Sequence, residues 1–214
     1  MSMKAPGANL VAALAADDES TRLRAALAAG SNVEPGLVDA LVARCAIESD
    51  FFVRDMLTWA LTRFPREATV PRLLAELRSE HAQARSQALH TLSKIRDARA
   101  WPAITRSLLH DFDDNVAQSA WRAAVALVPD DEKATLAAEL AAELGRGDRG
   151  TQLSLSSALV SLGEGVVEPV LKKAIASDDP AVRSHADATE RLLRDPNAGS
   201  QHGINQVKRI LAPN

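Results

Sequence analysis

The sequence has little of what several classes of protein depend on. Its 214 residues include one Cys, no Tyr and only 3% aromatic residues. A single Cys excludes an intramolecular disulfide framework and a Cys-rich zinc site. No run approaches the roughly 18 apolar residues that a membrane-spanning helix needs, so we predict no contact with a membrane. Because aromatic and β-branched residues are scarce, an all-β fold is disfavoured.

The sequence also lacks a large excess of charge of one sign, since 25 Lys and Arg residues nearly balance 28 Asp and Glu residues. The net charge of -3 therefore gives no general indication of nucleic-acid or membrane binding. Hydrophobic residues, in contrast, are abundant at 46%, and about one residue in five is Ala. That composition supports a substantial core and favours helix. A short apolar run after Lys4 resembles a signal peptide, but Asn9 interrupts it and Asp17 closes it. We expect a first helix there, and a cytoplasmic protein.

The chain repeats with a period near 32 residues. Six register positions stand 32, 31, 32, 35 and 31 residues apart: Thr21, Val53, Ala84, Val116, Thr151 and Val182. Three residues before each position stands Asp, except for His81 in the third unit. Four residues after it stands Ala or Leu, and Leu, Ile or Cys recurs 20 and 24 residues after each of the first five positions. Such a period is typical of stacked helical repeats, in which neighbouring units bury each other's apolar faces.

Each unit reads as a pair of helices. The recurring Asp suits the N-cap of the second helix, where its carboxylate accepts bonds from unpaired N–H groups. Pro71, Pro102 and Pro169 suit the first turn of the other helix, and Gly30 and Gly163 suit helix ends. The predicted helices span residues 7–16 and 20–29, 34–47 and 51–63, 67–78 and 82–94, 100–110 and 114–127, 132–144 and 149–162, and 165–176 and 180–193. A short C-terminal cap is predicted at 203–211.

These motifs resemble the HEAT-like repeats of bacterial proteins. The segments that carry the resemblance are Asp179-Pro180-Ala181-Val182-Arg183 and Asp97-Ala98-Arg99-Ala100-Trp101-Pro102. The resemblance implies an all-α, right-handed α-solenoid of about six helical hairpins, forming a single domain over 1–214. The expected repeats are 7–30, 34–64, 67–95, 100–128, 131–162 and 165–194. Families built from such repeats include scaffolds, bilin-lyase subunits and alkylpurine DNA glycosylases.

The resemblance also implies that the second helices line the concave side. Residues five, six and ten positions after the register points of the second to fourth units are expected to lie off the core and to cluster there: Trp59, Arg63, His90, Lys94, Trp121 and Arg122. Residues 51–109 contain 10 Lys and Arg residues but 5 Asp and Glu residues, so this middle carries +5 and the remainder -8. A basic groove with two indoles suits an acidic peptide, a phosphate-bearing ligand or a nucleic-acid strand. Core packing is the alternative for Trp59 and Trp121.

We therefore expect a non-catalytic binding or scaffold module whose partner is a protein or peptide of acidic character. Nucleic acid remains the open alternative, and the sequence does not determine the oligomeric state. The recurring arginines (Arg22, Arg54, Arg85 and Arg183) are expected to bond neighbouring loops or Asp caps rather than a ligand.

Catalytic motifs are missing from the sequence, which predicts neither a cofactor nor a metal site. The five His residues show no HExxH spacing, and there is no Walker or GxGxxG loop. Cys45 occupies an apolar position and is expected to be a buried thiol. Asp111, Asp113 and Asp114 are expected to be solvated. The enzyme alternative implied by the resemblance is an alkylpurine DNA glycosylase, for which Trp59, Trp121, Arg122 and Asp55 have suitable residue types.

Overall fold

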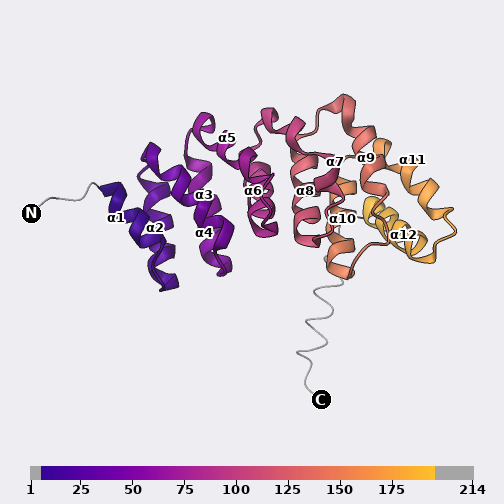
Figure 1. Cartoon of the computed structure of the whole chain (residues 1–214). Coiled ribbons are helices and arrows are strands. Elements are labelled where there is room, and N and C mark those ends of the chain that lie inside the picture. Colours follow the sequence, from indigo (N-terminus) through magenta and orange to yellow (C-terminus); the bar gives the residue numbers. More distant parts are fainter. Residues whose placement is uncertain (1–5, 196–214) are drawn as a thin grey trace, which may run out of the picture. The chain divides into compact units, whose positions relative to one another are not determined.

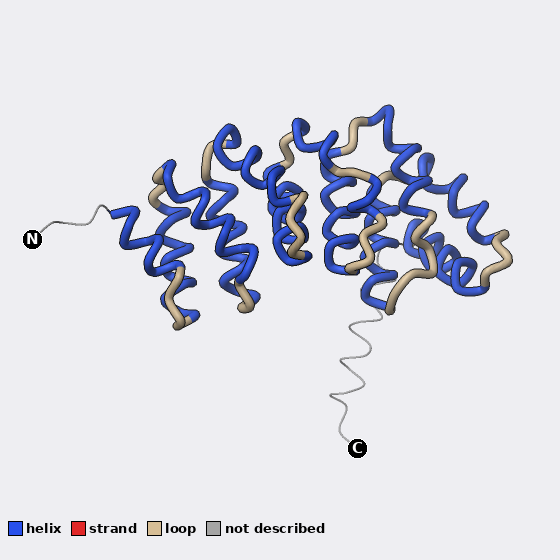
Figure 2. The backbone as a smooth tube through the Cα atoms, viewed as in Figure 1, coloured by secondary structure: helices blue, strands red, loops and turns tan. Residues whose placement is uncertain are grey.

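The computed structural model describes residues 6–195, and this part of the chain is helical with no β-strand (Figure 1). The predicted cap at 203–211 lies outside the described residues. The chain divides into two compact units, residues 1–127 and 128–214, which are described separately below. Short loops join successive helices within each unit (Figure 2). The all-α repeat fold is confirmed, whereas the organisation as a single domain stays a prediction.

The first unit contains four consecutive hairpins. Their elements are α1 (Pro6–Leu14) and α2 (Glu19–Ser31), η1 (Pro35–Leu37), α3 (Val38–Ile47) and α4 (Phe51–Arg63), α5 (Arg66–Glu76) and α6 (Ala82–Ile95), and η2 (Ala98–Ala103), α7 (Arg106–Leu109) and α8 (Asp114–Leu127). Second helices pack in series, α2 on α4, α4 on α6 and α6 on α8, while α3 packs on α1 and α5. Fully buried Ala residues stand between these helices, among them Ala26, Ala60 and Ala120. Their small side chains let the helices approach closely.

The second unit contains two hairpins: η3 (Asp130–Glu132), α9 (Lys133–Ala141) and α10 (Arg149–Ser161), then α11 (Glu164–Ile175) and α12 (Pro180–Arg194). Here α9 packs on α11 and α10 on α12. Buried His185 joins these hairpins, because its Nδ1 accepts the Gly145 N–H at 3.0 Å and its Nε2 lies 2.9 Å from the Gln152 carbonyl. Burial lowers the pKa of His185, which favours the neutral ring that this pairing requires.

The predicted Asp N-caps are confirmed. The carboxylates of Asp18, Asp50, Asp148 and Asp179 accept hydrogen bonds from backbone N–H groups in the first turns of α2, α4, α10 and α12. Asp113 accepts from the N–H groups of Asn115 and Val116 at 2.9 and 3.2 Å. His81 makes no side-chain cap, as its departure from the Asp pattern indicates. The recurring acid thus fixes where the second helices begin.

Predictions based on Pro and Gly were partly wrong. The expected helix 100–110 is instead η2, which contains Pro102, followed by the short α7, because the chain leaves helical geometry at Ile104. Pro71 and Pro169 lie inside α5 and α11 rather than in their first turns, because both helices begin five residues earlier. Gly30 lies within α2 and does not end it. Gly163, with φ of 99°, does follow the end of α10.

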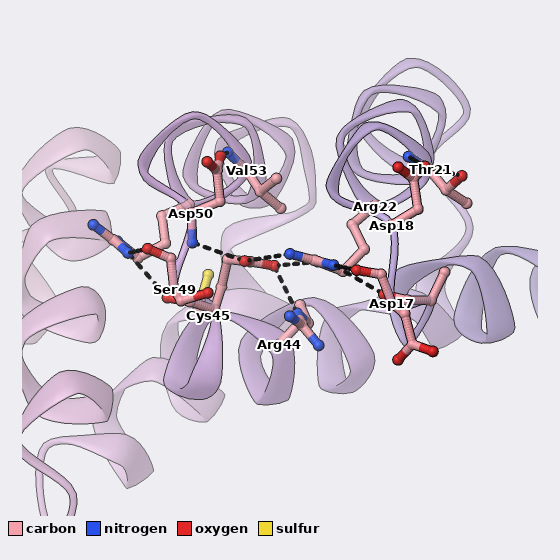
Figure 3. A network of polar contacts seen from close by, with 12 residues as sticks. Asp17, Asp18, Thr21, Arg22, Arg44, Cys45, Ser49, Asp50 and Val53 are labelled. Atoms are coloured by element: carbon pink, nitrogen blue, oxygen red, sulfur yellow. Dashed lines mark hydrogen bonds and ion pairs between the residues drawn. The ribbon is translucent and has the colours of Figure 1, made fainter.

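The recurring arginines bond the loops that precede their own helices, as predicted. Arg22 donates to the carbonyls of Ala16 and Asp17, and Arg54 donates to those of Glu48 and Ser49 (Figure 3). Arg85 and Arg183 repeat the arrangement on the carbonyls of Ser79, Glu80 and Ser177. Within the described residues, these four arginines therefore satisfy carbonyl groups between helices, where few backbone N–H donors remain.

Two of these arginines also reach an acid 26 residues further along the chain, in the next hairpin. Arg22 pairs with Glu48 through two bonds of 2.7 and 2.9 Å, and Arg44 donates to the same carboxylate at 2.8 Å. Arg85 pairs with Asp111 at 2.9 and 3.2 Å. The expectation that Asp111 is solvated was therefore wrong, because this pairing holds its side chain at 9% exposure.

Candidate functional site

A pocket opens on the surface that α4, α6 and α8 share within the first unit. Its volume is about 210 Å³. Its walls come from three helices, with Phe51, Arg54, Asp55 and Thr58 on α4, Ser86, Gln87 and His90 on α6, and Asn115, Gln118, Ser119 and Arg122 on α8. We call it the α4–α6–α8 pocket. It lies across the second to fourth repeats, the part of the chain for which a binding surface was predicted.

Two residues of the predicted site, His90 and Arg122, line this pocket. The His90 side chain is half-buried, and Arg122 is exposed, with its Nη2 donating to Ser119 Oγ at 3.1 Å. Burial lowers the pKa of His90, the positive charges of Lys94 and Arg122 lower it further, and the Asp55 carboxylate partly opposes them. These effects favour the neutral imidazole, which can donate one hydrogen bond and accept another.

Trp121 does not belong to the surface, and its prediction as a binding residue was wrong. The side chain is fully buried, and its indole N–H donates to the Leu109 carbonyl at 2.8 Å. The error lies in the position five residues after the register point, which we expected to face away from the core. At that position Thr58, Leu89 and Trp121 are all buried, because each second helix has neighbours on several sides.

Trp59 and Arg63 lie together on α4, outside the pocket lining. The Trp59 side chain is 38% exposed, and the Arg63 guanidinium carbon lies 6.0 Å from the indole centroid. This cation–π geometry keeps a positive charge beside an accessible aromatic face. The indole occupies space that Gly30 leaves on α2, since a Cβ there would lie 2.4 Å from Trp59 Cζ3 and 2.9 Å from the Ala60 Cα.

Replacing Gly30 with Ala is expected to destabilise the first unit by about 1–3 kcal/mol, because backbone as well as indole must move. The same change should expose the Trp59 ring and shift its fluorescence to longer wavelength. Thermal unfolding and emission spectra measure both effects. Gly36→Ala is the matched control, since a Cβ at Gly36 would meet nothing within 4 Å. Equal melting temperatures for the two variants would contradict this account of how Trp59 is seated.

The positive charge of the middle segment is spread more widely than we predicted. Lys94 and Arg63 are exposed on the second helices. Other basic residues of this segment lie elsewhere, and several are paired, with Arg72 bonded to Asp39 and Arg99 to Asp97. The α4–α6–α8 pocket itself contains Asp55 as well as Arg54 and Arg122. Three exposed cations (Arg63, Lys94 and Arg122) are thus what remains of the predicted basic groove.

A polar group that the sequence analysis missed lies in the pocket wall. The Thr58 hydroxyl is buried, with the side chain 4% exposed, and it has no hydrogen-bond partner within residues 6–195. Such a group costs folding free energy, so its presence calls for an explanation. The available signal was the repeat itself, which has Leu89 and Trp121 at the corresponding positions of the next two units.

Reactive groups are not gathered at this surface. Cys45 is buried, and burial raises the pKa of its thiol to about 12, so it is an unreactive packing residue. In the part of the chain that the structure describes, no three His, Cys, Asp or Glu side chains are placed to hold a metal ion. Its helices are all too short or too polar to cross a membrane.

The stacked hairpins define this protein as an α-helical repeat protein. Residues 48–126 match the family model described as HEAT repeats, which supports a HEAT-like repeat fold for this part of the chain. It is similar to a chain in the complex of CpcE and CpcF of phycocyanin lyase from Nostoc sp. PCC7120, with 24% identity, a TM-score of 0.50 and coverage of 90% of this chain and 78% of that one. An engineered protein is similar at 22% identity and a TM-score of 0.49, covering 92% of this chain and 98% of its own. No curated protein sequence matches.

Proposed function

We propose that this HEAT-like repeat protein is a non-catalytic binding module that holds a segment of a protein partner along α4, α6 and α8. The α4–α6–α8 pocket carries the proposal, because it gathers polar side chains from three consecutive repeats at the predicted surface. Packed helices present these groups in fixed positions, which reduces the entropy lost on binding. A cytoplasmic location is part of the proposal.

The partner segment is proposed to carry acidic residues near the pocket. Arg63, Lys94 and Arg122 are exposed around it, and the cation–π pair of Arg63 with Trp59 offers both charge and apolar contact. Exposed charges of one sign steer a partner of opposite sign and add specificity. The similar Nostoc structure is a complex of two proteins, which agrees with a protein partner.

Replacing Arg63 and Lys94 together with Glu is expected to weaken partner binding at least tenfold while leaving the fold intact, because both side chains are exposed. The measurement is affinity capture of the native partner from an extract of the source cells, followed by titration with the purified partner. Arg72→Glu/Arg78→Glu is the matched control, since it makes the same charge change on α5 and its following turn. Equal partner binding by both double variants would refute the proposed surface.

The alternative of a DNA-binding protein or alkylpurine DNA glycosylase is less well supported. Its motivating residues included Trp121, which is buried and inaccessible to a base. Binding to DNA that weakens steeply with salt, together with release of alkylated purines from damaged DNA, would favour this alternative. We expect neither, because the Asp55 carboxylate lies in the pocket and would repel a phosphate backbone.

A further inference from the structure

We propose that the α4–α6–α8 pocket binds a primary amide, the side chain of a Gln or Asn in an extended segment of the partner. This inference rests on the proposed function and specifies what the pocket recognises. It starts from one observation, the buried Thr58 hydroxyl that lines the pocket without a hydrogen-bond partner among the described residues. A ligand atom in the pocket would satisfy this group, which the fold leaves unsatisfied.

The other open groups in the pocket are of both hydrogen-bonding kinds. Within residues 6–195, the Asp55 carboxylate and the Gln87 side-chain amide have no hydrogen-bond or ion-pair partner. Arg122 donates one hydrogen bond to the Ser119 hydroxyl and has further N–H groups that can donate to a ligand. The Asp55 carboxylate can only accept, and the Arg122 guanidinium can only donate. A ligand that satisfies both must itself donate and accept.

Charge then selects among the ligands that fit this requirement. A carboxylate or phosphate would be attracted by Arg122 but repelled by Asp55. An ammonium group would be attracted by Asp55 but repelled by Arg122. The Arg54 guanidinium also lines the pocket and keeps its positive charge, but its Nη1 donates to the carbonyls of Glu48 and Ser49. A carboxylate would therefore still leave the Asp55 carboxylate without a donor, whereas an amide supplies one. A primary amide carries no charge, has two N–H donors for Asp55, and has a carbonyl that accepts from Arg122 and Thr58.

Size and apolar contact agree with a single side chain. The pocket volume of about 210 Å³ is smaller than a usual small-molecule site of roughly 300–1,000 Å³. Phe51 forms part of the lining and is 65% exposed, so it can cover the methylene stem of a Gln side chain. The acidic residues proposed for the partner would flank this amide and meet Lys94 and Arg63.

The test uses the full-length chain and three peptides with the sequence Glu-Ala-X-Ala-Glu, where X is Gln, Glu or Leu. Titration by calorimetry or by fluorescence anisotropy of labelled peptides gives their affinities. We expect the Gln peptide to bind about tenfold more tightly than the Glu and Leu peptides, as the loss of one bond to a charged group predicts. Asp55→Asn is expected to remove or reverse the preference for Gln over Glu, because the repulsion of a carboxylate disappears.

Thr58→Val separates recognition from folding. Val has nearly the same shape as Thr, so this change should reduce binding of the Gln peptide about three- to tenfold. The melting temperature should stay unchanged or rise, because an unsatisfied buried hydroxyl is removed. A purely structural role for Thr58 predicts the opposite pattern, with lower stability and unchanged binding.

Several outcomes would overturn the inference: equal or tighter binding of the Glu peptide to the wild-type chain, no binding of any of the three peptides, or unchanged selectivity in Asp55→Asn. If one of these occurs while Arg63→Glu/Lys94→Glu still loses the native partner, the proposed function stands and the amide assignment fails. Competition of oligothymidylate with a bound peptide would instead identify nucleic acid as the occupant.

Discussion

Replacing Glu48 with Ala is expected to lower the free energy of unfolding by about 3–5 kcal/mol, a large share of the stability of a domain of this size. The Glu48 side chain is fully buried, and its two oxygens accept bonds from Arg22, Arg44 and the Asp50 N–H. Removing the carboxylate leaves two guanidinium groups in a partly buried site without their shared counter-charge. Urea unfolding followed by circular dichroism measures the loss.

The same carboxylate makes stability depend on acid. Burial by itself would raise the pKa of Glu48, but hydrogen bonds from Arg22, Arg44 and the Asp50 N–H outweigh burial and lower the pKa to about 2. Because the folded-state pKa lies below the ordinary value of 4.5, the contribution is complete above about pH 4.5. It is lost as the pH falls from there through about 2.

Glu48→Gln is the informative control for both effects. It keeps the shape of the side chain but cannot ionise, so its stability should be lower at pH 7 and should fall less between pH 4.5 and 2 than that of the wild-type chain. Asp39→Asn removes a carboxylate from an exposed ion pair with Arg72 and should change stability little. A Glu48→Ala variant as stable as Asp39→Asn would contradict the role assigned to this carboxylate.

Trp121→Ala is expected to cost about 3–5 kcal/mol, the second large effect. The substitution leaves a cavity in the core of the first unit and removes the bond from the indole N–H to the Leu109 carbonyl. Arg122→Ala, one residue further along α8, is the matched control and should change stability by no more than about 0.5 kcal/mol, because that side chain is exposed.

Fluorescence quenching tests the same assignment without relying on stability. In Trp59→Phe the signal of Trp121 should be shielded from iodide, whereas in Trp121→Phe that of Trp59 should be accessible, in line with its 38% exposure. Trp101 is present in both variants and serves as a constant background. Equal quenching in the two variants would place Trp121 on the surface and restore it to the proposed binding site.

Much of the fold could be predicted because its determinants are local and recur. Asp50 and Asp179 cap helices in their own turns, and their spacing from apolar positions is visible in the sequence. Pro102 shows the limit of this reasoning. Its position in the repeat equals that of Pro71, yet α5 continues through Pro71 while the chain breaks after Pro102. The local pattern alone therefore does not decide how far a helix continues past a proline.

The candidate site was predicted less completely, since its chemistry depends on contacts between repeats. The positions of His90 and Arg122 could be inferred from the period, because successive second helices place equal positions side by side. The burial of Trp121 depends on the full set of neighbours around α8, which a single helix face does not reveal. The repeat marks Thr58 as a polar residue at a position that is apolar in the next two units, but the lack of a partner for its hydroxyl depends on the surrounding packing and could not be inferred.

The pairing of arginines with acids in the next hairpin has a consequence for how the first unit opens. Buried ion pairs connect the first hairpin to the second, through Arg22 and Glu48, and the third to the fourth, through Arg85 and Asp111. Among the described residues, no buried ion pair connects the second and third hairpins. Their polar contacts are the hydrogen bonds from the neutral Gln83 amide to the Cys45 and Glu48 carbonyls and the exposed ion pair of Arg72 with Asp39. We therefore expect the second and third hairpins to separate first when the first unit unfolds partially. Their junction lies between α4 and α6, so the walls of the α4–α6–α8 pocket stand on both sides of this junction, and opening there would separate the α4 wall from the α6 and α8 walls.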